Sequence, residues 1–512
     1  MIIYTAADFK RHLEEQGQSV VLSDRDGHWK EVKNQEVTGL TYDSRQVKPQ
    51  TLFVCKGAAF KEKYLNESVA SGAIMYVSET AYDVPIPGLI VPDVRVAMPL
   101  LADLFFNSPQ KKLTLIGVTG TKGKTSTVYF LQSILNHYFA NRGEKPVGMI
   151  STVEINDGKE IIPSELTTPE SIVLFSHLAN AVAAGLTHIV VECSSQALKY
   201  NRLDGLNFDI GIFLNIDNDH ISPIEHHSFE DYLTAKLHLF DISKTAIYSL
   251  DSRATDAVQK AANKCSSQIT FSTSKASADI TGSVINNDSS GLTFTATTPG
   301  GASHTFKSPI SGRHNLENAL ATIACCRTLG ISDADIQTGF AAVKTPGRMD
   351  IRQTADHHIA CIIDFAHNRM SFNAVIDNAR ELFPGRPLIA VFGTVGDRSL
   401  DRGSEMAESV IEKGIDYVVV TDDDPGPLPP AEVRWRILKH LRAASIKYTE
   451  IGDRTQAMQE AMEWADRSST PSVILLLGRG PVNGMQLADG KTDYPSDIEI
   501  VEKLFHQRDN KH

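Results

Sequence analysis

The feature that most constrains this chain is the stretch GVTGTKGKTS at residues 117–126. An apolar run at 113–116 precedes it, and a helix-like run at 128–135 follows it. A strand, a glycine-rich loop, Lys-Thr and a helix in this order indicate a phosphate-binding loop, because backbone N–H groups at the helix N-terminus face the phosphate oxygens. Lys124 would neutralise the outer phosphates, and the Thr125 hydroxyl would reach Mg2+. We therefore expect a nucleoside triphosphate to bind here.

The glycine spacing departs from that of the usual phosphate loop. The usual pattern has a glycine five residues before Gly123, where this chain has Val118. The glycines fall instead at 117, 120 and 123. A purely structural glycine turn is the alternative, but the attached Lys-Thr pair and the preceding strand favour nucleotide binding.

Length and composition exclude several classes of protein. A chain of 512 residues that is 42% hydrophobic has about two to four domains with cores of their own. A net charge of -12 without an evident basic arm argues against nucleic-acid binding. The six cysteines form no Cys-x-x-Cys pair, and no apolar run approaches the roughly 18 residues of a membrane span. We expect a cytoplasmic protein with reduced thiols, no export signal and no membrane insertion.

Short β-branched runs alternate with helical stretches along most of the chain, which predicts an α/β fold with parallel sheets and right-handed crossovers. We expect three domains. The first is a small mixed α/β N-terminal domain at 1–108, and the second is a central phosphate-loop ATPase domain with a parallel sheet at 109–346. The third is a C-terminal Rossmann-like domain at 347–512. Four strand-like runs at 267–310 predict a small antiparallel element. They are QITFS, DITGSVI, LTFTATT and HTFKSPI.

Residues with useful chemistry follow several of the predicted strands. Ligands of open α/β sheets bind outside the carboxyl ends of the strands. Glu192 ends the run HIVVE, where a carboxylate could hold the Mg2+ of a nucleotide. The other residues at such positions are Asn215, Asp219, His220, Asp364 and His367. Each alone could be an ordinary turn or surface residue, but their joint occurrence after a phosphate loop favours a site.

Lys236 lies in the middle of an apolar helix-like run, SFEDYLTAKLHLF, which Ser228 and Asp231 would cap. The simplest interpretation is a lysine whose ammonium reaches solvent along an amphipathic helix. The alternative is a buried lysine whose neutral amine is nucleophilic. Such an amine can take up carbon dioxide and become an anionic carbamate, which could ligate a metal.

Ten sequence blocks resemble the Mur ligase family, the ATP-dependent amino-acid ligases of peptidoglycan precursor synthesis. The resemblance covers essentially the whole chain, and the order and spacing of the blocks match that family. The blocks are YDSRQVKPQTLFV (42–54), GVTGTKGKTS (117–126), LTTPES (166–171), VECSSQAL (191–198), NIDNDH (215–220), AKLHLF (235–240), GRHNLENALA (312–321), PGRMD (346–350), DFAHN (364–368) and VFGTVGDRS (391–399).

The resemblance implies a role for particular residues. It implies a metal site of Thr125, Glu192, His220 and a carbamylated Lys236, with Lys124, His220 and Lys236 as the catalytic residues. Residues implied to bind ATP are Gly120, Thr121, Lys122, Gly123, Lys124, Thr125, Ser126, Asn315, Arg348 and Asp364. Residues implied to bind the uridine-linked muramoyl dipeptide are Ser44, Thr167, Thr168, Ser194 and Arg202. Arg398 would pair with the α-carboxylate of the incoming amino acid.

The resemblance also implies the reaction and its cofactors, ATP and Mg2+. The terminal carboxylate of UDP-N-acetylmuramoyl-dipeptide would attack the γ-phosphorus of ATP, and an amine would then attack the acyl phosphate and release phosphate. Two Mg2+ ions and Lys124 would neutralise the converging negative charges. We expect domain closure about the linker near Pro346-Gly347 to gate the reaction, and we favour a monomer.

Two departures from the family pattern concern the added amino acid. Enzymes that add diaminopimelate have Asp-Asn-Pro-Arg, with an arginine for the distal carboxylate, where this chain has Asp423-Asp424-Pro425-Gly426. The chain also has GRGPVNGMQ (478–486) where that type has Gly-Lys-Gly-His-Glu. No guanidinium is left for a second carboxylate, and an added acid could meet a side-chain ammonium. We therefore expect L-lysine, with L-ornithine as an alternative.

Other interpretations of the chain remain open. Asp423 and Asp424 could simply belong to a solvated loop that caps the next helix. A paralogue could add diaminopimelate or another amino acid. A ligase that extends folate with glutamate would share the phosphate loop, Glu192 and the lysine, but should lack the YDSR block. A non-catalytic scaffold should have lost a phosphate or metal residue, and none is missing.

Overall fold

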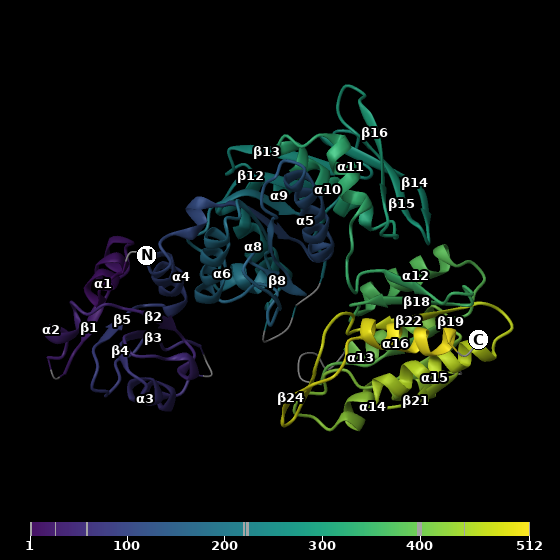
Figure 1. The fold of residues 1–512 in the computed structure, drawn as a ribbon. Helices are drawn as coiled ribbons and strands as arrows, with labels where there is room; N and C mark the ends of the chain where they lie inside the picture. The colour runs from purple at the N-terminus through teal and green to yellow at the C-terminus, as the bar shows by residue number, and fades with distance from the viewer. Residues whose placement is uncertain are drawn as a thin grey trace. The chain divides into compact units, whose positions relative to one another are not determined.

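A computed structural model describes residues 3–25, 27–57, 60–218, 221, 225–396, 402–444 and 446–510. Sixteen α-helices and twenty-four β-strands in this part of the chain confirm the α/β class (Figure 1). The chain divides into two compact units. Unit 1 consists of Met1–Thr281, Thr298–Ala302 and Glu317–Gly339, and unit 2 of Gly282–Thr297, Ser303–Leu316 and Phe340–His512. The three domain boundaries predicted above stay a prediction.

The N-terminal part of unit 1 is a five-stranded sheet of order β1-β5-β4-β3-β2. Its strands are β1 (Val21–Ser23), β2 (Gly39–Thr41), β3 (Thr51–Val54), β4 (Ala73–Ser78) and β5 (Gly88–Ile90). Successive side chains of a strand face opposite sides of a sheet. Leu52 and Met75 therefore pack with helices α1 (Ala6–Glu15) and α4 (Val94–Phe105), whereas Phe53 and Tyr76 pack with α3 (Glu62–Ala70).

The rest of unit 1 is built on a second sheet, whose strands have the order β13-β12-β11-β6-β10-β7-β8-β9. The central strand β6 (Thr114–Thr119) is paired in parallel with β10 (His188–Glu192) and β11 (Phe208–Phe213). The outer strands are β7 (Gly148–Ile150), β8 (Glu154–Asn156), β9 (Ile161–Pro163), β12 (Ser243–Ser249) and β13 (Ser267–Ser272). Helices α5 (Lys124–Ala140), α6 (Ser171–Ala184), α7 (Ser195–Lys199) and α8 (Phe229–Asp241) connect them. The carboxyl ends of β6, β10 and β11 therefore meet at one edge.

The antiparallel element predicted at 267–310 is smaller than expected. Strand β13, which contains the run QITFS, pairs in parallel with β12 and so extends the main sheet. The first residues of β14 (Ile280–Asp288) also pair in parallel, with the end of β13. Only the hairpin of β15 (Gly291–Thr297) and β16 (Ser303–Ser308) has an antiparallel register among the pairings of this segment described by residue. Assigning QITFS to an antiparallel element was wrong.

Unit 2 contains a three-layer α/β sandwich. Its sheet has the order β17-β18-β22-β19-β20-β21, and every neighbouring pair is parallel except β17 with β18. Its strands are β17 (Asp350–Gln353), β18 (Ile359–Asp364), β19 (Leu388–Phe392), β20 (Tyr417–Val420), β21 (Tyr448–Glu450) and β22 (Ser472–Leu477). One face packs on α12 (Arg369–Leu382), α13 (Arg402–Glu412) and α14 (Pro430–Ala443), and the other on α15 (Arg454–Arg467) and α16 (Asp497–Asp509).

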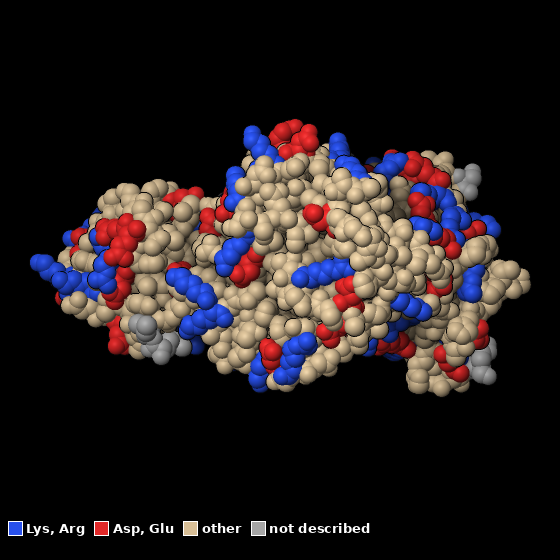
Figure 2. Space-filling model, turned by 90° about the horizontal axis from the view of Figure 1, so that it is seen from above, with Lys and Arg blue, Asp and Glu red and all other residues tan. Residues whose placement is uncertain are grey.

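The charges on the surface and the character of the helices can be compared with the composition of the chain. Figure 2 shows acidic and basic side chains interspersed over the face in view. Within the described ranges, no helix combines the length and the apolar character that crossing a membrane requires.

Candidate functional site

The phosphate loop has the strand-loop-helix structure predicted from the sequence. Strand β6 ends at Thr119 and helix α5 begins at Lys124, so the loop proper is residues 120–123. Val118 is a buried residue inside β6, which explains why no glycine is needed there. Gly123 caps α5 with φ of 85°, and a Cβ at this position would overlap the Asn318 carboxamide. Gly123 is thus required by both its conformation and its surroundings.

Two lysines converge on one carbonyl of this loop. The Nζ atom of Lys124 donates to the Gly120 oxygen at 3.0 Å, and the Nζ of Lys236 donates to the same oxygen at 2.8 Å. Lys236 is only 1% exposed, and its Nζ lies 4.7 Å from the centre of the Tyr232 ring. Its ammonium therefore does not reach the surface, and the snorkelling interpretation was wrong.

Glu192 lies next to the phosphate loop at the end of β10. The Thr125 hydroxyl donates to its two carboxylate oxygens at 3.2 and 3.1 Å. Thr152 donates to the same carboxylate through its backbone N–H and its hydroxyl, each at 3.0 Å. Glu192 is buried, so these bonds hold its carboxylate in one orientation beside the loop. The chain thus places a hydroxyl and a carboxylate together, as Mg2+ coordination requires.

A second set of predicted residues is connected directly to Glu192. The Thr168 hydroxyl donates to the backbone oxygen of Glu192 at 2.6 Å and accepts from the backbone N–H of Ser194 at 3.0 Å. The hydroxyls of Thr152 and Thr167 are 3.1 Å apart. Arg202 donates to the backbone oxygen of Thr168 at 3.1 Å. The residues predicted for phosphate and for substrate therefore form one continuous network.

Two residues beside this network, Lys56 and Glu170, were not predicted, although their partner Arg202 was. One oxygen of Glu170 accepts from Arg202 at 2.8 Å and from Lys56 at 2.6 Å. Lys56 follows β3 in the N-terminal part, and burial lowers its pKa although Glu170 opposes this effect. No local pattern could have revealed the set, because its members come from three separate parts of the sequence.

Asn215 supports the phosphate loop from the end of β11. Its carboxamide oxygen accepts from the backbone N–H of Lys122 at 2.9 Å, and its backbone oxygen accepts from the N–H of Thr121. The Tyr232 hydroxyl donates to the Thr121 side chain at 3.2 Å. Burial raises the pKa of Glu317, and a hydrogen bond with Asn215 opposes this effect. The loop is therefore held from several elements before any ligand binds.

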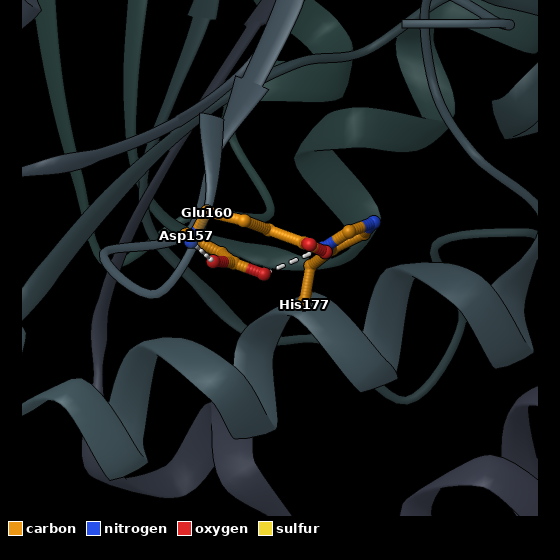
Figure 3. A group of neighbouring side chains, drawn as sticks. All are labelled: Asp157, Glu160 and His177. Carbon is orange, nitrogen blue, oxygen red and sulfur yellow. Dashed lines mark hydrogen bonds and ion pairs between the residues drawn. The ribbon is translucent and has the colours of Figure 1, made fainter. Parts of the chain in front are cut away.

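The hairpin of β8 and β9 is attached to α6 by a buried carboxylate (Figure 3). Asp157 Oδ2 accepts from His177 Nδ1 at 2.7 Å and from Asn180 Nδ2 at 2.8 Å. Its Oδ1 accepts the backbone N–H groups of Lys159 and Glu160, each at 3.0 Å. Burial alone would raise the pKa of Asp157, but these bonds more than offset it and lower the pKa. With both oxygens occupied by donors, Asp157 serves as a clamp and not as a metal ligand.

Three of the residues predicted for ATP lie in unit 2. Asp364 accepts the backbone N–H groups of Met349 and Ala366, each at 2.9 Å, and its pKa is raised by burial although Arg348 and His314 oppose this effect. The Arg348 guanidinium lies 5.0 Å from the centre of the Phe365 ring. Asn315 begins α10 (Asn315–Thr328) and donates to the backbone oxygen of Ser311 at 2.8 Å. His314, which acts on the pKa of Asp364, was not among the predicted site residues.

The two acids proposed for the amino acid are not free. The Arg479 Nη1 donates to Asp423 Oδ1 at 3.3 Å and to Asp424 Oδ1 at 3.1 Å. Burial raises the pKa of Asp423, whereas Arg454 and Arg479 oppose this effect. From the sequence we expect an added acid to meet a side-chain ammonium, with a solvated capping loop as the alternative. The pairing of both acids with the arginine of the block GRGPVNGMQ was not anticipated.

The remaining predicted residues lie in other parts of the chain. The Ser44 hydroxyl, near the start of the chain, donates to Glu67 at 3.1 Å. Ser126 is buried in the first turn of α5. Asp219, His220 and Arg398 lie outside the described residues.

A phosphate loop, a buried lysine at its carbonyl and a carboxylate at the neighbouring strand end define a nucleoside-triphosphate-using α/β enzyme. The Mur ligase middle domain matches residues 118–326, and the Mur ligase, glutamate ligase domain, matches residues 347–480. The chain belongs to the Mur ligase family. As a member of that family it is an ATP-dependent ligase that joins an amino acid to its substrate in peptidoglycan synthesis.

Similar proteins cover nearly the whole chain. The UDP-N-acetylmuramoyl-L-alanyl-D-glutamate--L-lysine ligase of Streptococcus suis (strain 05ZYH33) is 36% identical over 98% of each chain. The enzyme of that name from Enterococcus faecalis is 34% identical, over 98% of this chain and 96% of its own. The structure of a UDP-N-acetylmuramoyl-L-alanyl-D-glutamate--2,6-diaminopimelate ligase has a TM-score of 0.65 at 22% identity, and covers 99% of this chain and 100% of that one. MurF from Acinetobacter baumannii has a TM-score of 0.66 at 19% identity, with 99% of each chain covered. These structures share the fold.

Proposed function

We propose that this ligase adds L-lysine to UDP-N-acetylmuramoyl-L-alanyl-D-glutamate. The full-length relatives of that name support the substrate. The observation that carries the proposal is the hydrogen bond from Thr168 to the backbone oxygen of Glu192. It joins the residues suited to phosphate to those suited to the muramoyl dipeptide, so a carboxylate held at one end would face a phosphoryl group held at the other.

The phosphate end would bind ATP through the loop backbone and Lys124. Lys124, Thr125 and Ser126 form the first turn of α5, whose partial positive charge at the N-terminus favours phosphate. The hydroxyl of Thr125 and the carboxylate of Glu192 supply oxygen donors that fit Mg2+, and we propose that His220 adds a nitrogen donor. Bound there, Mg2+ would neutralise charge on the transferred phosphoryl group.

The substrate end would hold the muramoyl dipeptide through Thr167, Thr168, Ser194 and Arg202. We propose the uridine nucleotide for the N-terminal part of unit 1, where Ser44 lies. A cavity of about 550 Å³ there has the volume typical of a small-molecule site. Phe60, Tyr82, Asp93 and Arg95 are among the residues that line it, so it offers rings and charged groups to a nucleotide.

Different residues of the chain would then act in different steps of the reaction. Arg202 and the threonine hydroxyls would orient the D-glutamate carboxylate toward the γ-phosphorus of ATP. Lys124 would stabilise the charge that develops on the transferred phosphoryl group. Arg398 would hold the α-carboxylate of L-lysine, while its α-amine attacks the acyl phosphate and inorganic phosphate leaves. We further propose that Asn315, Arg348 and Asp364 contact ATP.

We propose that Lys236 is carbamylated in the active enzyme. Lys236 is buried in α8 beside the phosphate loop, and the neutral form of a lysine amine is the form that reacts with carbon dioxide. The intact-protein mass, measured under conditions that retain carbon dioxide, should exceed the mass calculated from the sequence by the mass of one carbon dioxide molecule. The Lys236→Arg variant should lack this increment, and an unmodified amine in the active, metal-loaded enzyme would refute the proposal.

The remaining proposals concern organisation and location. We propose the three domains 1–108, 109–346 and 347–512, and a monomer. The enzyme would act in the cytoplasm, since all six of its cysteines are unpaired and buried.

ADP release measured with the purified precursor and a panel of amino acids tests the function directly. We expect release with L-lysine and much less with diaminopimelate, L-ornithine or L-glutamate. The Glu192→Gln variant should release no ADP with any of them. A preference of the native enzyme for diaminopimelate, or activity only with a folate and glutamate, would overturn the assignment.

A further inference from the structure

Arg479 is a buried cation that the reaction described above does not use. It follows β22 in the segment GRGPVNG, residues 478–484, here called the GRG loop. Its Nη2 donates to the backbone oxygens of Val482 and Gly484, at 3.4 Å for Val482. Its Nη1 donates to the carboxylates of Asp423 and Asp424. One guanidinium therefore joins the GRG loop to the acidic loop, residues 422–426.

The two acids of the acidic loop have different surroundings. Asp423 is buried, and a Cβ at Gly478 would lie 2.7 Å from its Oδ2, so this side of Asp423 is closed. The side chain of Asp424 is 39% exposed. Its Oδ1 accepts from Arg479 and, at 3.0 Å, from the backbone N–H of Gln486. Within the described ranges no residue donates to its Oδ2. Asp424 thus has one oxygen committed to the protein and the other available to a ligand.

The position of Arg479 is itself fixed by its neighbours. The next residue, Gly480, donates its backbone N–H to Asp497 Oδ2 at 3.2 Å. Asp497 forms a fully buried, two-pronged ion pair with Arg454, at 2.6 and 2.8 Å, and Arg454 also donates to the backbone oxygen of Leu477. The GRG loop is therefore anchored on both sides of Arg479. A guanidinium on so rigid a base can set the orientation of a neighbouring carboxylate.

We propose that Arg479 is a positioning residue for the incoming amino acid. It holds Asp424 Oδ1 inward, so that Asp424 Oδ2 receives the terminal ammonium of a diamino acid side chain. The proposal rests on the proposed function, and it identifies which of the two acids meets the substrate. A distal carboxylate would be disfavoured here because both Nη atoms of Arg479 are already engaged. The selectivity for a diamino acid then arises because Arg479 orients the Asp424 carboxylate, and not because the loop contains two acids.

The test compares L-lysine with L-norleucine, whose side chain lacks the terminal ammonium, by ADP release. In the Asp424→Asn variant we expect kcat/KM for L-lysine to fall at least about tenfold through KM, while the value for L-norleucine changes less than about threefold. Arg479→Met should lose selectivity in the same way, and Arg479→Lys should recover part of it. The KM for ATP should stay unchanged. Asp489→Asn, an exposed residue between β23 (Met485–Leu487) and β24 (Gly490–Thr492), is the matched control.

A double variant separates positioning from simple stability. If Arg479 acts through Asp424, the double variant Arg479→Met/Asp424→Asn should be no worse with L-lysine than Asp424→Asn alone. The proposal would be overturned if the losses in kcat/KM of the two single variants multiplied in the double variant. It would also be overturned if the KM for L-lysine were unchanged in Asp424→Asn. If thermal unfolding shows that Arg479→Met does not fold, Arg479→Lys takes its place in the same comparison. Absence of lysine-dependent ADP release in the native enzyme would instead refute the proposed function.

Discussion

At the scale of single residues, the site is organised by backbone oxygens and hydroxyls as much as by charges. The Gly120 carbonyl receives two lysines, and Glu192 receives two threonines. These groups have fixed positions before ATP binds, so little reorganisation is needed during the reaction. Substitutions that remove charge and substitutions that move the backbone should therefore both impair catalysis.

Replacing Lys124 by alanine should lower turnover at least about a hundredfold, because it removes a preorganised charge worth roughly 3–4 kcal/mol at the transferred phosphoryl group. Steady-state ADP release measures the effect, and circular dichroism should show an unchanged fold. Lys111→Ala, at an exposed position before β6, should retain full activity. Ligation at a near-normal rate by Lys124→Ala would contradict the assignment of the loop.

Replacing Gly123 by alanine should raise the KM for ATP at least about tenfold, because the new Cβ would overlap Asn318 and φ is positive. Gly143 provides a matched control, since its φ is also positive, at 69°, but no atom lies near its Cβ position. Gly143→Ala should therefore leave the KM for ATP unchanged. Adding Asn318→Ala to Gly123→Ala should relieve the overlap but not the backbone strain, and equal KM values for the Gly123 and Gly143 variants would refute this account.

The sequence predicted the residues that a local pattern or a strand end marks. Glu192 was found from its place at the end of an apolar strand, and Thr168 from a family block. Glu170, Lys56 and Arg479 were missed, because each acts through a partner distant in sequence. Charge pairing across a fold leaves no periodic signal along the chain.

At the scale of secondary-structure elements, the β8–β9 hairpin matters because it carries Thr152 on one side and Thr167 on the other. The clamp of Asp157 with His177 and Asn180 attaches its turn to α6. A loosened turn would therefore disturb the contacts of Thr152 with Glu192 as well as the local structure.

Replacing Asp157 by asparagine should cost about 1–3 kcal/mol at pH 7, because buried donors lose a charged acceptor. The folded protein lowers the pKa of Asp157, so its contribution is present above the unfolded pKa of about 3.9 and is lost as pH falls through the lower folded value. Thermal midpoints of the native protein and the variant should therefore differ at pH 7 and converge below about pH 4. The exposed Glu160→Gln is the control, and a gap that persists in acid would contradict the prediction.

Strands with continuous apolar runs were the easiest elements to predict. HIVVE was found with the bounds that the structure has, because a parallel strand buried on both faces has an uninterrupted apolar signal. QITFS was misassigned because polar residues alternate with apolar ones at the less buried end of the sheet. Alternation marks exposure of one face, and it does not report strand direction.

At the scale of the whole molecule, the six cysteines share one environment. All of them are buried and unpaired, and burial raises the pKa of every one. A raised pKa and lack of access both slow reaction with thiol reagents. The native fold should therefore protect the thiols in both units.

Titration with a chromogenic disulfide at pH 8 should detect less than about one thiol per native chain within minutes, and all six in denaturant, since only accessible thiolates react. Ligase activity should not depend on added reductant. Rapid reaction of several thiols in the native enzyme would show that part of the fold opens readily.

Glu170 has a consequence for how the precursor is recognised. Because it already engages Lys56 and Arg202, an anionic group of the precursor can reach these cations only by displacing it. Binding would then exchange one ion pair for another, and the number of paired charges would stay nearly constant. The dissociation constant of the precursor should accordingly vary little with ionic strength, and should become salt-sensitive once Glu170 is replaced by glutamine and leaves both cations to the solvent.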